Sequence, residues 1–365
     1  MAQRDPRGTS YASRSDGPVS EVAIRWKHPL DTGVLAFSYP SPVVADGIVY
    51  AVGQETLGVD ARSGEKRFRR SYGAGVSPAV GPARAYRTPT VAVPSTRGVT
   101  ALHGHGGHTI GGQAIAATRW TTTSDQDTTL INDSSPRTSP VATDELILAY
   151  IEGALTALET SSGNTRWTEA TAFTRPAVHD GVAYVGLGPG YILGAIDLET
   201  GSVQRFEPAD SFIRSVTVSE GQLLVATDDA LLGVSPNGAV NWRFDDERYH
   251  GWGESCLAAA NGTAYTGIST AAGSALIAID TADGSLEWES PVSVSQSGKF
   301  EPPAVTDEMI YVPTEGGPLV GIDQKTGDIS WQFQDGETST WSPVAISRDA
   351  LYAVSDETLY ALEEA

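Results

Sequence analysis

The sequence predicts an all-β chain folded as an eight-bladed β-propeller, and two repeated patterns carry this prediction. The first is a short phrase, apolar-Asp-x-x-x-Gly-x-x-x-Trp, which recurs along the 365 residues and contains six of the eight tryptophans. Residues 279–288 and 322–331 are complete copies. The second is a hairpin pattern upstream of each phrase, as at 41–52, in which two β-branched runs flank an Asp-Gly-like turn. Such repetition at roughly 40 residues indicates four-stranded blades stacked in a ring.

The hairpins number eight, and each opens one blade. The blades begin near Ser41, Ser77, Ser139, Arg175, Ser215, Cys256, Pro302 and Ser342. A third run, a polar turn with glycine and a fourth strand with an aromatic residue complete the pattern. We expect these docking aromatics to lie wedged between neighbouring sheets; they are Trp26, Phe68, Trp120, Trp167, Phe206, Trp242, Trp288 and Trp331. Truncating a buried one to alanine should cost about 3–5 kcal/mol.

The last blade lacks a fourth strand at the carboxyl end of the sequence. The missing strand is predicted at the amino end, where residues 22–27 carry the same Arg-Trp pair as the outer strands of other blades. We therefore expect 22–27 to be the outer strand of the last blade, which closes the ring and removes open sheet edges. Residues 22–365 then form one propeller domain, preceded by an extended segment of residues 1–21.

The charge is strongly acidic, with 45 Asp and Glu against 24 Lys and Arg and a net charge of −21. Only four of the basic residues are lysines. An acidic, lysine-poor composition is similar to that of salt-adapted proteins, so we expect a halophilic source and a fold that loosens at low ionic strength. The sequence has no basic stripe that would neutralise phosphates, which argues against a nucleic-acid partner.

Residues 1–18 are polar and show no apolar core of a signal peptide. No run of 18 apolar residues could span a membrane. We expect a cytoplasmic location if Met1 is the native start, and an extracytoplasmic or cell-surface location if an export signal was removed. Cys256 is the single cysteine, so an intrachain disulfide is excluded. We expect a monomer.

The docking phrase and the blade pattern resemble those of the pyrroloquinoline-quinone (PQQ)-type repeat propellers, over roughly residues 22–365. That family has a branch of quinoprotein alcohol dehydrogenases and a branch of non-catalytic scaffolds, such as the lipoprotein propeller of bacterial outer-membrane protein assembly. The opening stretch from Asp5 to Tyr11 resembles the segment ahead of the ring in haloarchaeal members. The resemblance favours an exported protein, because the family is mostly extracytoplasmic.

For the dehydrogenase branch, the resemblance implies a quinone held by Ca²⁺, a stacking tryptophan and a disulfide between adjacent cysteines. One cysteine excludes that disulfide, and no Glu/Asn/Asp set of this sequence aligns with a calcium site. We therefore expect no catalytic residues and no cofactor, and a non-enzymatic scaffold that binds a protein or peptide. The alternative is a PQQ-dependent, alcohol dehydrogenase-like oxidoreductase that uses PQQ with Ca²⁺ in a reduced site.

Candidate binding residues occur where the inner strands are predicted to begin, close to the axis of the ring. This predicted axial funnel consists of Arg137, Arg175, Arg214, Glu254, Glu301, Trp252, Trp341 and Tyr39. Arginines facing acidic residues between aromatic walls would suit a zwitterionic ligand or an extended segment of a partner. Alternatively, the Arg and Glu side chains pair with each other across the channel and close it.

One stretch breaks the repeat. In the second blade the Asp-x-x-x-Gly turn is replaced by a glycine-rich sequence that contains His103, His105 and His108. Imidazoles at this spacing could bind Zn, Ni or Cu, and we keep a metal-binding protein as a further alternative. The other interpretation is a glycine-rich turn with solvated histidines, since no fourth ligand is adjacent.

Overall fold

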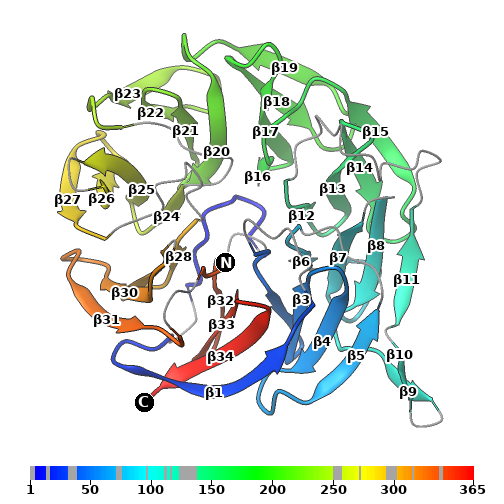
Figure 1. The fold of residues 1–365 in the computed structure, drawn as a ribbon. Helices are drawn as coiled ribbons and strands as arrows, with labels where there is room; N and C mark the ends of the chain where they lie inside the picture. The colour runs from blue at the N-terminus through cyan, green and yellow to red at the C-terminus, as the bar shows by residue number, and fades with distance from the viewer. Residues whose placement is uncertain are drawn as a thin grey trace.

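The computed structural model describes residues 5–13, 17–31, 39–70, 76–95, 98–110, 113–115, 117–122, 138–249, 257–270, 273–292, 302–314, 316–336 and 340–365. These residues form strands, turns and loops, and no helix is found among them. Eight four-stranded antiparallel sheets surround a central axis (Figure 1). The eight-bladed propeller predicted from the repeats is thereby confirmed.

Blades 1 to 8 are numbered along the chain by their innermost strands. These strands are β2 (Val43–Ala45), β6 (Ala79–Gly81), β12 (Val141–Ala142), β16 (Ala177–His179), β20 (Ile213–Ser219), β24 (Ala258–Ala260), β28 (Ala304–Val305) and β32 (Ala345–Ser347). The second strands, in the same order, are β3 (Ile48–Val52), β7 (Thr90–Ser95), β13 (Leu146–Ile151), β17 (Val182–Leu187), β21 (Gln222–Thr227), β25 (Thr263–Thr270), β29 (Met309–Pro313) and β33 (Ala350–Ser355).

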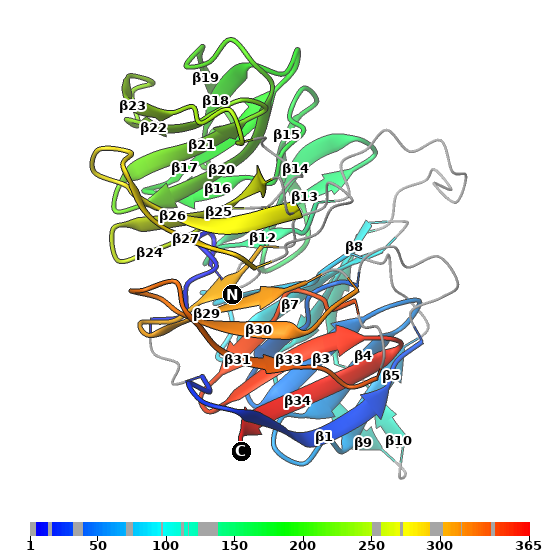
Figure 2. The same ribbon diagram turned by 60° about the vertical axis from the view of Figure 1, so that its left-hand side comes forward.

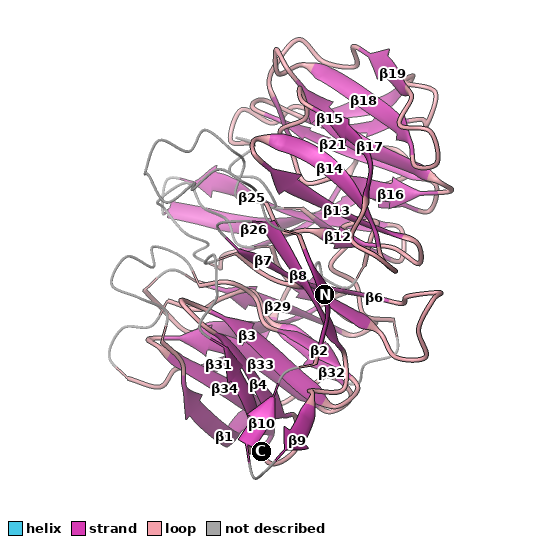
Figure 3. Cartoon of the chain, turned by 90° about the vertical axis from the view of Figure 1, so that its right-hand side faces the viewer, coloured by secondary structure: helices cyan, strands magenta, loops and turns pink. Residues whose placement is uncertain are grey.

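The third strands are β4 (Thr56–Asp60), β8 (Gly98–His103), β14 (Ala154–Glu159), β18 (Ile192–Asp197), β22 (Leu231–Val234), β26 (Gly273–Asp280), β30 (Leu319–Asp323) and β34 (Thr358–Glu364). The outermost strands are β5 (Lys66–Arg70), β11 (Thr118–Thr121), β15 (Thr165–Glu169), β19 (Val203–Phe206), β23 (Val240–Phe244), β27 (Leu286–Ser290), β31 (Ile329–Phe333) and β1 (Val22–Pro29). A separate hairpin of β9 (His108–Ile110) and β10 (Gln113–Ile115) follows β8 (Figure 3) and lies beside β5 (Figure 1).

The amino-terminal strand closes the ring as expected. β1 pairs antiparallel with β34, with Trp26 opposite Ala361, and runs two residues further than predicted (Figure 2). Arg25 on β1 forms ion pairs with Glu363 at 2.6 Å and with Asp349 at 2.7 Å. The outer strand of blade 8 is thus held by side chains as well as by the ladder.

Burial changes from the middle of each blade to its rim. β3 and β33 are buried along their whole length, whereas β5, β15, β23 and β31 bury the central aromatic and expose the residues on either side of it. Sheets packed on both faces need near-continuous apolar runs, which explains the β-branched character of the inner hairpins. Eight clusters of buried hydrophobic residues fill the spaces between neighbouring blades.

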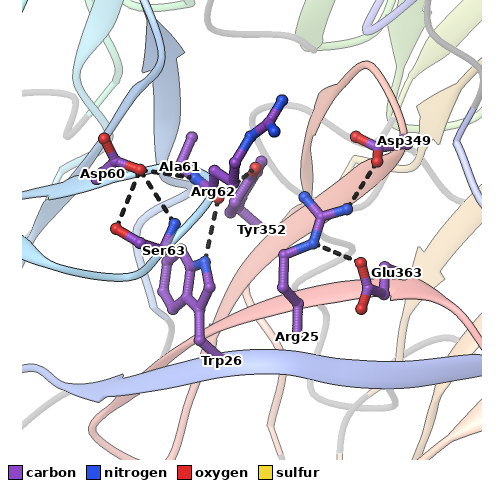
Figure 4. A network of polar contacts seen from close by, with 9 residues as sticks. All are labelled: Arg25, Trp26, Asp60, Ala61, Arg62, Ser63, Asp349, Tyr352 and Glu363. Atoms are coloured by element: carbon purple, nitrogen blue, oxygen red, sulfur yellow. Dashed lines mark hydrogen bonds and ion pairs between the residues drawn. The ribbon is translucent and has the colours of Figure 1, made fainter.

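Most of the docking aromatics join one blade to the next in the same way. In five blades the indole N–H donates to the carbonyl that follows the acidic residue of the next blade's turn: Trp26 to Ala61, Trp120 to Thr160, Trp167 to Leu198, Trp242 to Thr281 and Trp288 to Gln324. The glycine of the same turn lies on the ring, as Gly64 does on Trp26 and Gly284 on Trp242. Figure 4 shows this contact between blades 8 and 1, where Tyr352 also donates to the Ala61 carbonyl.

These turn glycines explain why the phrase requires its particular residues. Gly284 has a φ of +78°, and a Cβ there would come within 2.6 Å of the Trp242 ring, so both conformation and space favour glycine. The Asp side chains accept hydrogen bonds from N–H groups two or three residues later, as Asp60 does from Arg62 and Ser63. The phrase is therefore a docking turn rather than a calcium loop.

Candidate binding site at the ring axis

The amino-terminal segment crosses the axis of the ring. Residues 5–12, which we call the N-terminal strap, lie against the innermost strands of blades 4 to 7 and occupy the centre of Figure 1. Four inner-strand N–H groups donate to strap carbonyls: Val178 to Pro6 at 2.7 Å, Val218 to Arg7 at 3.0 Å, Ala259 to Thr9 at 2.9 Å and Val305 to Ser10 at 3.0 Å. The Ala12 N–H donates back to Val305 at 2.8 Å.

The strap is preorganised by its own turn. The Gly8 N–H donates to the Asp5 carbonyl at 3.1 Å, and the Asp5 carboxylate accepts from the N–H groups of Arg7 and Thr9 and from the Thr9 hydroxyl. Gly8 has a φ of +77°, which favours glycine. Asp, Pro and Gly at positions one, two and four are typical of a type I turn, and this is the sequence signal that could have located the strap.

Tyr11 fixes the other end of the strap. Its hydroxyl donates to the Asp307 carboxylate and also lies 3.1 Å from the Asn261 side-chain oxygen. Burial, and then the Asp307 carboxylate, raise the pKa of Tyr11 to about 12. The phenol therefore stays protonated, and able to donate, across the physiological range.

Arg175, predicted as a funnel residue, lies under the strap. An added Cβ on Gly8 would come within 3.1 Å of its guanidinium. Burial lowers the pKa of Arg175 to about 10, and the nearby Asp5 carboxylate acts in the opposite direction. Arg175 thus meets the protein's own segment at the axis.

A cavity of about 760 Å³ lies beside the strap. One wall consists of strap residues, among them Asp5, Arg7 and Tyr11. The opposite wall consists of the inner strands and turns of blades 1 and 8, including Val44 and Ile346. The turns of blades 5 and 6 complete it. The cavity therefore opens at the hairpin-turn end of the inner strands, whereas the funnel was predicted where those strands begin.

A second cavity, of about 480 Å³, adjoins the first. It is lined by β6 and the 82–89 loop of blade 2, and Asp46 lines both cavities. Its lining includes two arginines, Arg84 and Arg87, and two aspartates, Asp46 and Asp144.

The other described funnel residues lie in three separate surroundings. Trp341 is 1% exposed, with its ring 5.7 Å from Phe333 and 5.1 Å from Tyr360 between blades 7 and 8. Tyr39 packs on the core between blades 8 and 1, and burial raises its pKa. Arg214 forms an ion pair with Asp228 and lies over the Phe212 ring. The remaining funnel residues lie outside the described residues: Arg137, Trp252, Glu254 and Glu301.

The histidine sequence docks blade 2 onto blade 1. The Tyr50 hydroxyl donates to the His103 carbonyl at 2.7 Å and accepts from the Gly106 N–H at 3.0 Å. The rings of His103 and His105 lie 5.5 Å apart, and the side chain of His108 lies outside the described part of the chain. Within that part, no three His, Cys, Asp or Glu side chains gather as a metal site. The carbonyl of this turn replaces the one supplied by the docking phrase in other blades.

The comparisons with known proteins agree with this architecture. A family model described as outer membrane protein assembly factor BamB matches residues 17–232 and 227–365. The chain belongs to that family. A BamB from Legionella pneumophila (strain Paris) is 26% identical over 197 residues, which are 50% of this chain and 49% of that relative. Thus only about half the length of this curated relative is matched.

Solved structures show the shared fold. The BamB structure from Moraxella catarrhalis has a TM-score of 0.67 at 14% identity and covers 94% of this chain and 100% of that one. The quinohemoprotein alcohol dehydrogenase ADHIIG from Pseudomonas putida HK5 has a TM-score of 0.72 at 11% identity. The match covers 99% of this chain and 79% of that one. The ring fold is therefore shared with a BamB and with a quinohemoprotein alcohol dehydrogenase.

Of the two funnel tryptophans, only Trp341 lies among the described residues, and its surroundings do not fit a stacked quinone. A flat cofactor needs an exposed aromatic face on which to stack, and the Trp341 ring is enclosed by Phe333 and Tyr360. Polypeptide already crosses the axis from blade 4 to blade 7. As for the membrane, no helix with the length and apolarity to cross it occurs among the described residues.

Proposed function

We propose that this propeller is a non-enzymatic scaffold that binds a protein or peptide partner at the hairpin-turn end of its axis. The observation that carries the proposal is the strap itself. The inner edge of the ring already holds a segment of the chain by main-chain hydrogen bonds, beside a cavity of about 760 Å³. Membership in a family described as an assembly factor supports the same function.

Site-specific photo-crosslinking tests this function. A benzoylphenylalanine at Ser347, on the wall of the cavity, should form a discrete adduct with one partner in cells that naturally produce the protein. The matched control is the same photoreactive residue at Val240, which is 44% exposed on the outer rim and faces away from the axis. Equal labelling from both positions, or none from Ser347, would contradict the proposal.

The oxidoreductase alternative makes a separate prediction. A quinoprotein would bind PQQ together with Ca²⁺ and then oxidise an alcohol with an artificial electron acceptor. We expect neither tight binding nor turnover, because the enclosed Trp341 offers no face to a flat ring. Calorimetry followed by a dye-linked assay measures both, and turnover would replace the scaffold proposal with the enzymatic one.

We further propose that the protein works outside the cytoplasm, at the cell surface of a salt-loving organism. The net charge of −21 supports the salt requirement. The Debye length grows from about 3 Å at 1 M salt to about 30 Å at 0.01 M, so the acidic residues repel one another over longer distances in dilute buffer. The unfolding temperature should therefore be lower in 0.01 M KCl than in 1 M KCl. Equal unfolding temperatures in both would contradict salt adaptation.

A further inference from the structure

Eight backbone N–H groups at equivalent positions face the axis, one from each innermost strand. They belong to Val44, Val80, Ala142, Val178, Val218, Ala259, Val305 and Ile346. In every blade this residue pairs with the second residue of the blade's second strand, as Val44 does with Val49 and Val178 with Ala183. The residue after it closes the hairpin, so its own N–H points away from the sheet and toward the axis.

The strap uses four of these groups, all in one continuous arc. The N–H groups of blades 4, 5, 6 and 7 donate to strap carbonyls at 2.7–3.0 Å. The other four also form a continuous arc, through blades 8, 1, 2 and 3, which we call the open arc: Ile346, Val44, Val80 and Ala142. Within the residues that the structure describes, no acceptor takes up these four N–H groups.

The two cavities lie along the open arc. Val44 and Ile346 line the larger one, and Val80 lines the smaller one. Little of these three residues is exposed to solvent, backbone included: 3% of Val44, 2% of Val80 and 0% of Ile346. These strands therefore form part of the cavity walls, and their side chains pack in the cores between blades.

The charged residues around the open arc favour neither an acidic nor a basic partner. Asp46, Glu220 and Arg348 face the larger cavity, and Arg84, Arg87 and Asp144 face the smaller one. Recognition is then carried by the main chain, as when an extended peptide adds to an exposed sheet edge. The strap is bound in this way, since Pro6, Arg7, Thr9 and Ser10 all accept through their carbonyls although their side chains differ.

We propose that the open arc binds a segment of the partner protein through its main chain, with carbonyls that accept from Ile346, Val44 and Val80. The segment would lie opposite the strap and complete the inner circle of hydrogen bonds. This inference rests on the proposed scaffold function and adds to it the chemical class of the partner. It also assigns the strap a second role, as the fixed half of the binding surface.

Amide hydrogen exchange of the intact protein, followed by NMR, tests the proposal. The probe is a synthetic peptide with the strap sequence Asp-Pro-Arg-Gly-Thr-Ser-Tyr-Ala, and the control is its all-D enantiomer. In the free protein, the amides of Val178, Val218, Ala259 and Val305 should exchange slowly and those of the open arc rapidly. The L-peptide at ten times its dissociation constant should slow Val44, Val80 and Ile346 about tenfold. The enantiomer should leave them unchanged.

Three outcomes overturn the proposal: slow exchange of the open arc in the free protein, no change with the L-peptide, or an equal change with both enantiomers. The scaffold function is tested apart from this. A partner that crosslinks to Ser347 but leaves the amide exchange of Val44 and Val80 unchanged would support the scaffold function and contradict binding at the open arc. If Ser347 forms no crosslink at all, the scaffold function itself is contradicted, and the open-arc proposal with it.

Discussion

The docking layer between the blades and the lining of the axis are built by opposite means. Between blades, the same side chains recur: an indole, a turn carbonyl and a glycine with positive φ. At the axis, the backbone positions recur but their partner does not, because a single strap serves four blades. The repeated contacts between blades thus build the ring, whereas the candidate site is formed by the strap, which does not repeat.

The amino-terminal segment supplies what the repeat lacks in three places. β1 completes blade 8, and residues 5–12 line the axis. Between them, the Pro18 carbonyl accepts from the Trp331 indole at 3.3 Å and from the Tyr311 hydroxyl at 3.2 Å. It stands in for the docking turn, which blade 8 does not have. One segment therefore links the docking layer with the axis.

The largest expected effect is in the docking layer. Trp242 is 8% exposed and donates to Thr281 at 2.7 Å, so Trp242→Ala should lower the free energy of unfolding by about 3–5 kcal/mol. Val240→Ala is the control, two residues earlier on β23 and 44% exposed. Denaturant unfolding measures both. A loss below about 1 kcal/mol for Trp242→Ala would mean that the wedge does not hold the blades together.

The next effect separates the axis from the docking layer. Gly8→Val combines positive-φ strain with a contact on the Arg175 guanidinium, so the strap should detach. We expect the amides of Val178 and Val218 to exchange about 10–100-fold faster, which corresponds to about 1.4–2.8 kcal/mol.

The control for this variant is Gly47→Val. Gly47 has nearly the same φ, +76°, but nothing lies within 4 Å of an added Cβ. It should leave the exchange of Val178 and Val218 unchanged. The indole N–H of Trp242 reports the docking layer and should stay protected in both variants. If its protection falls with Gly8→Val, then the axis and the docking layer are not independent.

The docking layer could be predicted from the sequence, because each contact uses residues whose types recur at fixed spacing. The ring closure was equally visible, since residues 22–27 repeat the outer-strand pattern. The axial site was not, for a physical reason. The strap binds through backbone carbonyls, which every residue has, so residue types carry little information about it.

The predicted funnel rested on unusual residue types, and half of its eight residues lie outside the described part of the chain, while the described ones lie in different surroundings. Trp341 departs from the docking phrase, yet its ring fills the core between blades 7 and 8. Arg214 is paired within its own blade. The Asp-Pro-x-Gly turn at residues 5–8 was the informative feature of the axis, and it resembles an ordinary surface turn unless its contacts are known.

A smaller effect tests how much of the docking depends on the hydrogen bond. Trp242→Phe keeps an aromatic ring against Gly284 but leaves the Thr281 carbonyl without its donor. We expect a loss of about 1–2 kcal/mol, well below that of the alanine variant. Phe68 and Phe206 already serve as docking rings without a donor. A loss equal to that of Trp242→Ala would show that the hydrogen bond, rather than the ring, joins the blades.

The smallest effect concerns the charge inside a docking turn. The Arg67 guanidinium, followed by the Ser63 N–H, lowers the pKa of Asp60 to about 2. Asp60→Asn keeps an acceptor for Ser63 but loses the ion pair, which at this exposed position should cost about 0.5–1 kcal/mol at pH 7. Because the folded-state pKa is depressed, this stabilisation is present above the unfolded-state value of about 3.9 and disappears as the pH falls toward 2. Stability curves of the wild type and the variant should therefore converge below pH 4. The control is Asp210→Asn, an exposed site with the same change of charge, which should show no such convergence. Parallel stability curves for the wild type and Asp60→Asn would mean that the turn is held by its backbone alone.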